Sequence, residues 1–409
     1  MNRSPRRTDA SGPAEAAGSR SAGGIDVPDG VRLIETQADF DRFFAGIAGE
    51  PLLAVDTEAA SFHRYRDRIY LIQLSTRDET AVVDPLAVDD LADLGRMLGD
   101  PAVEIAFHDA DYDLRLLDRD YGFQANHLFD TRIAAQLLNE PGIGLAALLE
   151  KYLGIKLDKR FQRADWSARP LSAGMLAYAA ADTRYLAELR DIMRTRLEEM
   201  GRLAWAEEEF ALLEGVRWST ATDGEPGFLR IKGAKALRGR ALAILREVYE
   251  WREEIARRSD KAAFRIMNNE PMLAIAKAPP KDVEALKAIP GIGSELVQRR
   301  GRSLLTAIER ALELPESKWP KVERPPRRQP DPAFEARLER LKAVRNREAE
   351  RLQLAPGVAC PNGTLEAIAR AMPRTRDELG ALPEIRRWQV EALGKALLAA
   401  ARDPAQTET

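Results

Sequence analysis

The sequence predicts an α/β domain with a mixed β-sheet, followed by two small all-helical domains. Short apolar runs alternate with helical periodicity from residue 31 to about residue 120. Mainly helical patterns then continue to about residue 215, and two helical segments of similar length follow, each after a turn-rich or proline-rich stretch. The length of 409 residues exceeds what one ordinary core accommodates, which agrees with several domains.

The first part of the chain has the pattern of a sheet with intervening helices. Strands are predicted at the apolar runs "VRLIE", "LLAVD", "RIYLIQLS", "TAVVD" and "VEIAF", and helices at "ADFDRFFAGIA" and "LADLGRMLG". The middle runs lie close enough for antiparallel pairing, whereas the helix before "VEIAF" permits a crossover, so we expect a mixed sheet. Helices expected at "DYDLRLLDRDYG", "DTRIAAQLLN", "LAALLEKYLG" and "AGMLAYAAADTRYLAELRDIMRTRLEEM" would cover this sheet.

Two stretches indicate domain boundaries. "STATDGEPG" is rich in turn formers, and "KWPKVERPPRRQPDP" has too much proline for a helix and enough charge to stay extended. The N-terminus lacks the apolar core of a signal peptide, and Asp9 and Glu15 argue against an organellar presequence. The expected division is a disordered tail at 1–30, a first domain at 31–216, a linker at 217–236, a helical domain at 237–317, a Pro-rich basic linker at 318–332, a second helical domain at 333–403 and a tail at 404–409.

Cysteine content and hydropathy restrict the cellular setting. The single cysteine, Cys360, excludes an internal disulfide framework and a thiolate metal cluster, which favours a reducing compartment. No stretch approaches the ~20 consecutive apolar residues of a membrane span. We therefore expect a soluble, cytoplasmic protein with no membrane partner. The oligomeric state is left open by the sequence, and we favour a monomer.

The near-neutral net charge of −3 conceals an asymmetry along the chain. Residues 31–220 carry 22 Lys and Arg against 34 Asp and Glu, whereas residues 231–310 carry 17 against 10. An acidic segment is thus joined to a basic one. A basic module attracts a polyanionic partner such as nucleic acid.

The two helical segments have the pattern of an internal repeat with an offset of 93 residues. Apolar and turn residues coincide at this offset, although the glycine turn of the first copy, "IPGIGSELVQRRGRSLL", is missing from the second, "LPEIRRWQVEALGKALL". Two copies of one small helical module are therefore predicted. The matching positions are Leu286, Pro290, Ile292, Val297, Gly301 and Leu304 in the first copy and Leu379, Pro383, Ile385, Val390, Gly394 and Leu397 in the second.

Four carboxylates are candidates for a metal centre. Asp56 and Glu58 end an apolar run and, being two apart on a strand, project from the same face. Asp113 stands at the start of a predicted helix, and Tyr178 and Asp182, at i and i+4, share a helix face. Hard divalent cations would offset the repulsion among such carboxylates. Two such ions roughly 3.5 to 4 Å apart stabilise both oxygens of a displacement at phosphorus, which predicts phosphodiester hydrolysis.

The order of these residues resembles the DEDD-type 3′-to-5′ exonucleases of the ribonuclease-H-like fold. "VDTE" is similar to their first motif, "HDADYDLRLL" to the second, and "YAAADTRYL" to the third in its tyrosine-containing form. The likeness is closer to the ribonuclease D family, through "YLIQLST", "FDTRIAAQLL" and "LDKRFQRADWSARPL". The helical repeats resemble the helicase-and-RNase-D C-terminal (HRDC) domain, a nucleic-acid-binding module. Together these likenesses extend from about residue 31 to residue 402.

The resemblance implies a role for each candidate. Asp56, Glu58, Asp113 and Asp182 would hold two divalent metal ions, Mg²⁺ or Mn²⁺. Tyr178 would orient the attacking water. The catalytic set implied by the family is therefore these four acids and the tyrosine.

The second motif contains three acids, and only one matches the family position. Asp109 and Asp111 lie close to Asp113 in the sequence. We choose Asp113 because the family places its acid five residues after the histidine and directly before an apolar residue, as His108 and Leu114 stand here. His108 itself is expected to hydrogen-bond near the site and not to act as a base.

Candidate nucleic-acid contacts lie in both halves of the chain. In "LDKRFQRADW", basic groups alternate with aromatic rings, which suits a single strand; the alternative is a charged surface loop with both rings in the core. "PGIG" precedes a helix with several arginines and has the pattern of a turn whose N–H groups face a phosphate; the alternative is a tight turn between packed helices. The candidates are Gln73, His108, Lys159, Arg160, Gln162, Arg163, Trp166, Gly291, Gly293, Arg299 and Arg300.

The resemblance predicts a two-metal-dependent 3′-to-5′ exoribonuclease that releases nucleoside 5′-monophosphates. Its partner would be the single-stranded 3′ end of an RNA, and the family suggests precursors of tRNA and other small structured RNAs. One alternative is a 3′-to-5′ DNA exonuclease of the same fold. Another is a catalytically silent nucleic-acid-binding scaffold, against which the intact acids and Tyr178 argue.

Overall fold

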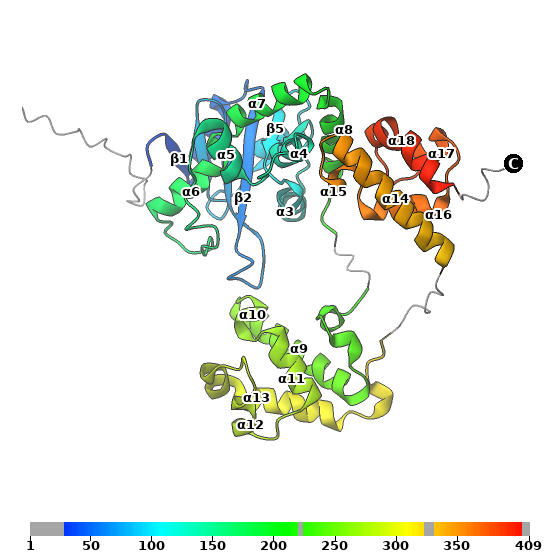
Figure 1. Ribbon diagram of the computed structural model, residues 1–409. Coiled ribbons are helices and arrows are strands. Elements are labelled where there is room, and N and C mark those ends of the chain that lie inside the picture. Colours follow the sequence, from blue (N-terminus) through cyan, green and yellow to red (C-terminus); the bar gives the residue numbers. More distant parts are fainter. Residues whose placement is uncertain (1–27, 220–223, 323–330, 403–409) are drawn as a thin grey trace, which may run out of the picture.

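The structure is a computed structural model that describes residues 28–219, 224–322 and 331–402. Most of the expected N-terminal tail, parts of both expected linkers and nearly all of the C-terminal tail lie outside the described residues. Figure 1 shows a sheet covered by helices, followed along the chain by two groups of helices. Among the described residues, no helix is long and apolar enough to cross a membrane.

A six-stranded mixed sheet forms the centre of the first domain, with the strand order β1-β4-β3-β2-β5-β6. The predicted mixed pairing is confirmed: β3 is antiparallel to β2 and β4, whereas β1 with β4, β2 with β5 and β5 with β6 are parallel. The short strand β6 was not predicted from the sequence. The strands are β1 (Val31–Ile34), β2 (Leu52–Ala59), β3 (Ile69–Ser75), β4 (Thr80–Val83), β5 (Glu104–Phe107) and β6 (Leu128–Asp130).

Eight helices of the described residues accompany this sheet. The long helical segment expected after residue 172 is divided at Tyr185, where the backbone leaves the helical conformation. The N-cap of α4 is Asp130, whose side chain accepts hydrogen bonds from the N–H groups of Arg132 and Ile133. The helices are α1 (Gln37–Gly46), α2 (Ala92–Gly99), α3 (Asp111–Tyr121), α4 (Thr131–Leu137), α5 (Leu145–Leu153), α6 (Ala173–Arg184), α7 (Leu186–Glu199) and α8 (Leu203–Leu213).

Helix α6 lies directly on the sheet and carries part of the candidate site. Ser172 caps its N-terminus by accepting from the Met175 N–H group. The buried side chains Ala179 and Ala180 are small, which lets the helix approach β2, β3 and β4 closely. This contact brings Asp182 of α6 next to Asp56 and Glu58 of β2.

The two helical modules repeat each other element by element. Residues 227–322 form the first helical module and residues 331–402 the second. Each α-helix of the second module begins 93 residues after its counterpart in the first. The predicted repeat is thus confirmed. The pairs are α9 (Gly239–Ser259) and α14 (Pro332–Arg351), α10 (Ala263–Ile266) and α15 (Pro356–Ala359), α11 (Asn269–Lys277) and α16 (Asn362–Ala371), α12 (Val283–Lys287) and α17 (Arg376–Gly380), and α13 (Ser294–Glu313) and α18 (Arg387–Ala401).

A buried arginine is repeated with its hydrogen bonds. Arg252 donates to the carbonyl of Met267 and to the side chain of Asn269. Arg345, 93 positions later, donates in the same way to the equivalent carbonyl and asparagine. Each arginine therefore joins the long first helix of its module to the start of the third helix, and satisfies the polar groups buried there.

The expectation of a linker at 217–236 is wrong for the second half of this range. Two short 3₁₀ helices, Gly227–Arg230 and Ala234–Ala236, begin the first helical module. Phe228 and Leu229 are buried in its core, because apolar side chains at these positions gain more from burial than an extended linker would allow. The module thus begins about ten residues earlier than expected.

The second helical module is docked on the first domain through α8. Trp205 and Trp388 stack with ring centroids 4.7 Å apart. Glu208 accepts hydrogen bonds of 2.7 and 3.0 Å from the backbone N–H groups of Arg387 and Trp388, the first residues of α18. The carboxylate of Glu208 thus occupies the N-terminus of α18 and interacts favourably with the helix dipole.

Candidate active site

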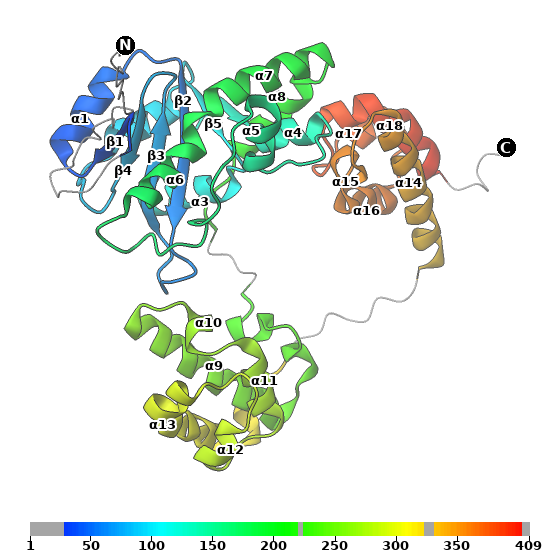
Figure 2. The same ribbon diagram turned by 60° about the vertical axis from the view of Figure 1, so that its left-hand side comes forward.

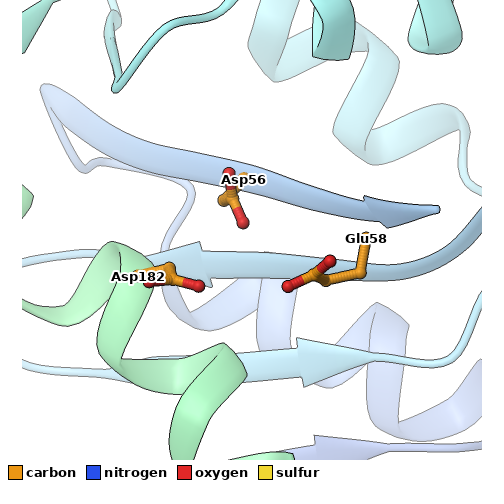
Figure 3. A group of neighbouring side chains, drawn as sticks. All are labelled: Asp56, Glu58 and Asp182. Carbon is orange, nitrogen blue, oxygen red and sulfur yellow. The ribbon is translucent and has the colours of Figure 1, made fainter. Parts of the chain in front are cut away.

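Three carboxylates converge between strand β2 and helix α6. Asp56 and Glu58 project from the same face of β2, and Asp182 reaches them from α6 (Figure 3). One oxygen from each of the three side chains lies within 4.8 Å of the others. The three side chains thus meet, as the sequence analysis expected, and their role as metal ligands stays a prediction.

The fourth acid, Asp113, lies beside this group but is held by β2. Its Oδ1 atom accepts hydrogen bonds from the Thr57 N–H group at 3.1 Å and from the Thr57 hydroxyl at 2.5 Å. Thr57 stands between Asp56 and Glu58 in the sequence, so the same strand supplies two acids and positions a third. Asp113 is outside the group within 4.8 Å, yet its charge raises the pKa of its three neighbours.

Burial and mutual repulsion make this cluster costly as four anions. Burial, followed by the charges of the neighbouring acids, raises the pKa of Asp56 and of Glu58 well above their usual values. Burial also raises the pKa of Asp113 to about 7, and burial with the charge of Asp113 raises the pKa of Asp182 to about 7. Divalent cations would remove the repulsion, and clustered carboxylate oxygens are the ligands that such hard ions prefer. The residues present therefore fit a divalent metal centre.

The structure separates the three acids of the second motif. Asp109 forms an ion pair with Arg132 at 2.9 Å, and Asp111 forms one with Arg115 at 2.8 Å. Only Asp113 turns toward β2. The choice of Asp113 from the sequence agrees with this geometry.

Tyr178 stands one helical turn before Asp182 and is supported by aromatic rings. The ring of Phe161 meets it edge to face at 6.4 Å, and that of Trp166 lies at 5.9 Å. Burial and the charges of Asp182 and Glu58 raise the pKa of Tyr178, because the phenolate would add another anion. The phenol therefore keeps its proton and is available as a hydrogen-bond donor.

The expected contact between Trp166 and RNA is wrong. The Trp166 side chain is 1% exposed and belongs to a small apolar cluster between α6 and the sheet. No base can stack on a ring whose faces are covered by protein atoms. Packing against Tyr178 explains why an aromatic residue stands at this position.

His108 lines the pocket with a defined tautomer. Its Nδ1 atom lies 2.9 Å from the Thr131 hydroxyl, which donates its own hydrogen to the Phe107 carbonyl at 3.0 Å. The hydrogen between His108 and Thr131 therefore belongs to the Nδ1 atom, and the Nε2 atom is left as an acceptor. Burial lowers the pKa of His108 to about 4, so the ring is neutral at ordinary pH.

Asp56 and Asp182 of the cluster line a cavity of 480 Å³, which is also lined by charged residues of both signs and by the start of α5. Lys159 and Gln162 line it from the loop that the sequence analysis identified for nucleic-acid contact. Arg160 does not line the cavity, but it pairs with Asp158, which does. The uncapped N-terminus of α5, from Gly144 to Ala147, also lines this cavity and was missed by the sequence analysis. Gly144 as N-cap before an apolar helix was the available signal, since it leaves backbone N–H groups free for an anion.

Two further candidates for nucleic-acid contact, Gln73 and the "PGIG" turn, have defined structural surroundings. Gln73 is fully buried on β3 opposite Asp56, and neither atom of its amide has a hydrogen-bond partner among the described residues. Gly291 has φ of +86°, and a Cβ atom there would lie 2.8 Å from the Pro271 side chain, so a tight turn requires glycine. Gly293 instead faces open space as the N-cap of α13, and Arg299 and Arg300 line a shallow cleft on the same module.

Comparison with known proteins agrees with this architecture. The family model for a 3′-5′ exonuclease matches residues 31–198, and that for the HRDC domain matches residues 241–308 and 334–400. The chain is 34% identical to a ribonuclease D of Gluconacetobacter diazotrophicus over 84% of this chain and 86% of the relative.

Solved structures show the same likeness. RNase D of Escherichia coli, described as an exoribonuclease involved in structured RNA processing, matches with a TM-score of 0.66 and 26% identity, over 90% of this chain and 98% of that one. A protein from Bifidobacterium adolescentis matches with a TM-score of 0.77 and 28% identity, over 92% of this chain and 97% of that one.

The mixed sheet, the convergent acids on β2 and α6, and the paired helical modules define the class of protein: a 3′-5′ exonuclease domain followed by two HRDC domains. The full-length similarity then settles the family. The chain belongs to the ribonuclease D family and is a 3′-5′ exoribonuclease. For this family the acidic cluster is a site for divalent metal ions.

Proposed function

We propose that the chain removes nucleotides from the 3′ ends of precursors of tRNA and other small structured RNAs, as a cytoplasmic monomer that uses Mg²⁺ or Mn²⁺. The observation that carries this proposal is the convergence of Asp56, Glu58 and Asp182 beside a cavity that Lys159 and the N-terminus of α5 also line. Such a cavity accepts a phosphodiester between its two walls. The similar E. coli structure, which is described as an exoribonuclease involved in structured RNA processing, supports the substrate class.

The proposed reaction is hydrolysis of the last phosphodiester bond. Two divalent ions bound by Asp56, Glu58, Asp113 and Asp182 would acidify the attacking water and neutralise the charge on both reacting oxygens. Water attacks phosphorus, the bond to the 3′ oxygen of the preceding nucleotide breaks, and that oxygen takes up a proton. The products are a nucleoside 5′-monophosphate and an RNA one nucleotide shorter.

Other residues of the site would orient the attacking water and bind the sugar and phosphates of the RNA. Tyr178 keeps its phenolic proton and would orient the attacking water. His108, with Nε2 as acceptor, would receive a hydrogen bond from a sugar hydroxyl of the bound nucleotide. Lys159 and the N-terminus of α5 would hold phosphates.

Matched RNA and DNA oligonucleotides with single-stranded 3′ ends test this proposal. Labels at the 5′ end and at the 3′ end would be followed separately, with Mg²⁺, Mn²⁺ or EDTA. We expect stepwise shortening of 5′-labelled RNA and immediate release of the 3′ label as a mononucleotide, both abolished by EDTA. Faster loss of DNA would favour a DNA exonuclease, and binding without hydrolysis of either would favour a scaffold.

Variants at two acids connect this activity to the site. Asp56→Asn removes a carboxylate of the cluster, and Asp111→Asn removes an acid that pairs with Arg115 two residues before Asp113. We expect only Asp56→Asn to abolish hydrolysis. Equal activity of the two variants would contradict the assigned site.

A further inference from the structure

The loop between β2 and β3 bridges the exonuclease domain and the first helical module. The Ala262 N–H group donates to the His63 carbonyl at 3.1 Å, and Arg265 donates to the Phe62 carbonyl. The Arg66 N–H group donates to Asp260 at 3.2 Å. Figures 1 and 2 both show this loop extending from the sheet toward α10.

Two exposed phenylalanines meet at this bridge. Phe62 is 48% exposed and Phe264 is 46% exposed, and their rings meet edge to face with centroids 6.1 Å apart. Among the described residues, the other phenylalanines are all buried or half-buried. A pair of half-exposed rings at a domain junction offers faces on which unstacked bases can lie.

Cations flank the aromatic pair on both sides. Arg163 lies over the Phe62 ring at 5.4 Å from its centroid. On the other side, Lys261, Arg265 and Arg300 line a cleft of 180 Å³ on the first helical module. Neither Lys261 nor Arg300 has a side-chain ion pair within the described parts of the chain. Arg299 in the same cleft pairs with Glu295 at 3.2 Å, and both side chains are about three-quarters exposed, so this pair is weak.

The bridging loop is linked to the loop that lines the active-site cavity. The His63 Nε2 atom lies 3.0 Å from the Arg163 carbonyl, which joins the bridging loop to the loop after α5. Gln162, the residue before Arg163, lines the cavity beside Asp56. Arg163 therefore lies between the cavity-lining Gln162 and the aromatic pair, and the basic cleft lies on the module that carries Phe264.

We propose that this strip, formed by Arg163, Phe62, Phe264, Lys261 and Arg300, binds the single-stranded RNA segment upstream of the 3′ end. The proposal rests on the proposed function, since the active-site cavity fixes where the 3′ end lies. Unstacked bases lie on the exposed rings, and the phosphates between them contact the cations. Alternation of rings and cations fits an unpaired strand, because the bases of a duplex are not free to stack on protein rings.

Binding and degradation of RNA of two lengths test the proposal. The probes are a fluorescent oligoribonucleotide of about 15 nucleotides, within the range that single-strand sites cover, and one of about 3 nucleotides that ends in the catalytic cavity. Affinities are measured by anisotropy in EDTA, where metal-dependent hydrolysis stops.

The variants are Phe264→Leu, which removes the ring and keeps apolar bulk, and Phe264→Trp, which keeps a ring. Leu312→Ala, at an exposed apolar residue on α13 of the same module, is the matched control.

We expect Phe264→Leu to weaken binding of the long probe by at least about fivefold, since stacking contributes about 1 to 3 kcal/mol per base. Phe264→Trp and Leu312→Ala should bind it as the wild type does, and all variants should bind the short probe and degrade it equally. Unchanged binding of the long probe by Phe264→Leu overturns the proposal, and so does equal weakening for both probes. Failure of the wild type to hydrolyse either probe would instead refute the proposed function, and the dependence on probe length would still support the strip.

The cationic part of the strip has a separate readout. Arg300→Gln should reduce the slope of log affinity against log salt for the long probe by about 0.7, the value for one phosphate contact of a single strand. Arg310→Gln, about three helical turns further along α13, serves as the control and should leave the slope unchanged. The same slope for Arg300→Gln and for the wild type would remove Arg300 from the strip.

Discussion

The carboxylates of Asp113 and Asp182 connect metal binding to pH. Burial raises the pKa of both to about 7 in the metal-free protein. A folded-state pKa above the unfolded value means that the folded protein binds more protons, so the metal-free protein loses stability as pH rises from about 4 to about 7. Divalent ions bind the deprotonated carboxylates and should reverse this loss.

Thermal unfolding with and without metal checks this coupling. We expect Mg²⁺ at 100 times its dissociation constant to add about 2.7 kcal/mol of stability at pH 8, and much less at pH 5.5 because protons compete for the same oxygens. The Tm increase should therefore be larger at pH 8 than at pH 5.5. An increase of the same size at both values, or one retained in Asp182→Asn, would argue against metal binding at this cluster.

Trp166 supports Tyr178 and does not present its ring to RNA. Trp166→Ala should lower the free energy of unfolding by about 3 to 5 kcal/mol, the usual cost of removing a large buried ring. At a temperature where the variant remains folded, we expect kcat to fall with Tyr178 less firmly placed, whereas RNA affinity in EDTA stays unchanged. A selective loss of RNA affinity with normal stability would restore the base-stacking role.

The residues of the site differ in how far the sequence reveals them. The spacing of Asp56 with Glu58 and of Tyr178 with Asp182 follows from strand and helix periodicity, so the sequence could place each pair on one face. The burial of Trp166 depends on how the loop after α5 folds back onto α6, which no local pattern encodes. The sequence also did not reveal that the N-terminus of α5 lines the cavity, because that position depends on packing between distant segments.

At the scale of elements, the two helical modules share one fold and differ in what meets their last helix. The N-terminus of α13 has Gly293 in open space, whereas that of α18 receives the carboxylate of Glu208 from α8. Glu209 adds hydrogen bonds to the side chains of Trp388 and Arg386. The repeat could be predicted from the offset of 93, but the docking could not, because its partners on α8 are not part of the repeat.

Replacing both glutamates tests this docking. Hydrogen bonds to charged groups contribute about 1.5 to 3 kcal/mol each, so Glu208→Ala combined with Glu209→Ala should release the second helical module. Small-angle scattering should then give a larger radius of gyration. Glu207→Ala, at the exposed neighbouring position on α8, is the control. An unchanged radius in the double variant would show that the remaining contacts hold the module, namely the tryptophan stack, the apolar core shared with the first domain and the hydrogen bond from Arg202 to the Leu352 carbonyl.

At the scale of the whole molecule, an acidic catalytic part and a basic module act on one polyanion. Residues 31–220 carry an excess of acids and residues 231–310 an excess of bases. The long-range attraction for RNA should therefore come from the first helical module, whereas the catalytic cavity depends on metal to accept a phosphate. The sequence predicted this division of charge, and the mixed sheet, from composition and spacing alone.

Salt dependence checks this division. The affinity for a long single-stranded RNA should fall more steeply with salt than that for a very short one, by about 0.7 in the slope of the log–log plot for each additional phosphate contact. Anisotropy titrations in EDTA at several salt concentrations measure both slopes. Parallel lines for the two lengths would mean that the basic module contributes no phosphate contacts.

The central claim is that the cluster of Asp56, Glu58 and Asp182 binds the metal that allows this chain to shorten RNA from its 3′ end. The most direct measurement is the rate of nucleoside 5′-monophosphate release from a single-stranded RNA as a function of Mn²⁺ concentration, for the wild type, Asp182→Asn and Asp111→Asn. The account predicts saturable, metal-dependent release by the wild type and by Asp111→Asn. It also predicts a loss of about a hundredfold or more in Asp182→Asn, since a metal ion provides several kcal/mol of transition-state stabilisation. Release by Asp182→Asn at the wild-type rate, or release that does not depend on metal, would contradict it.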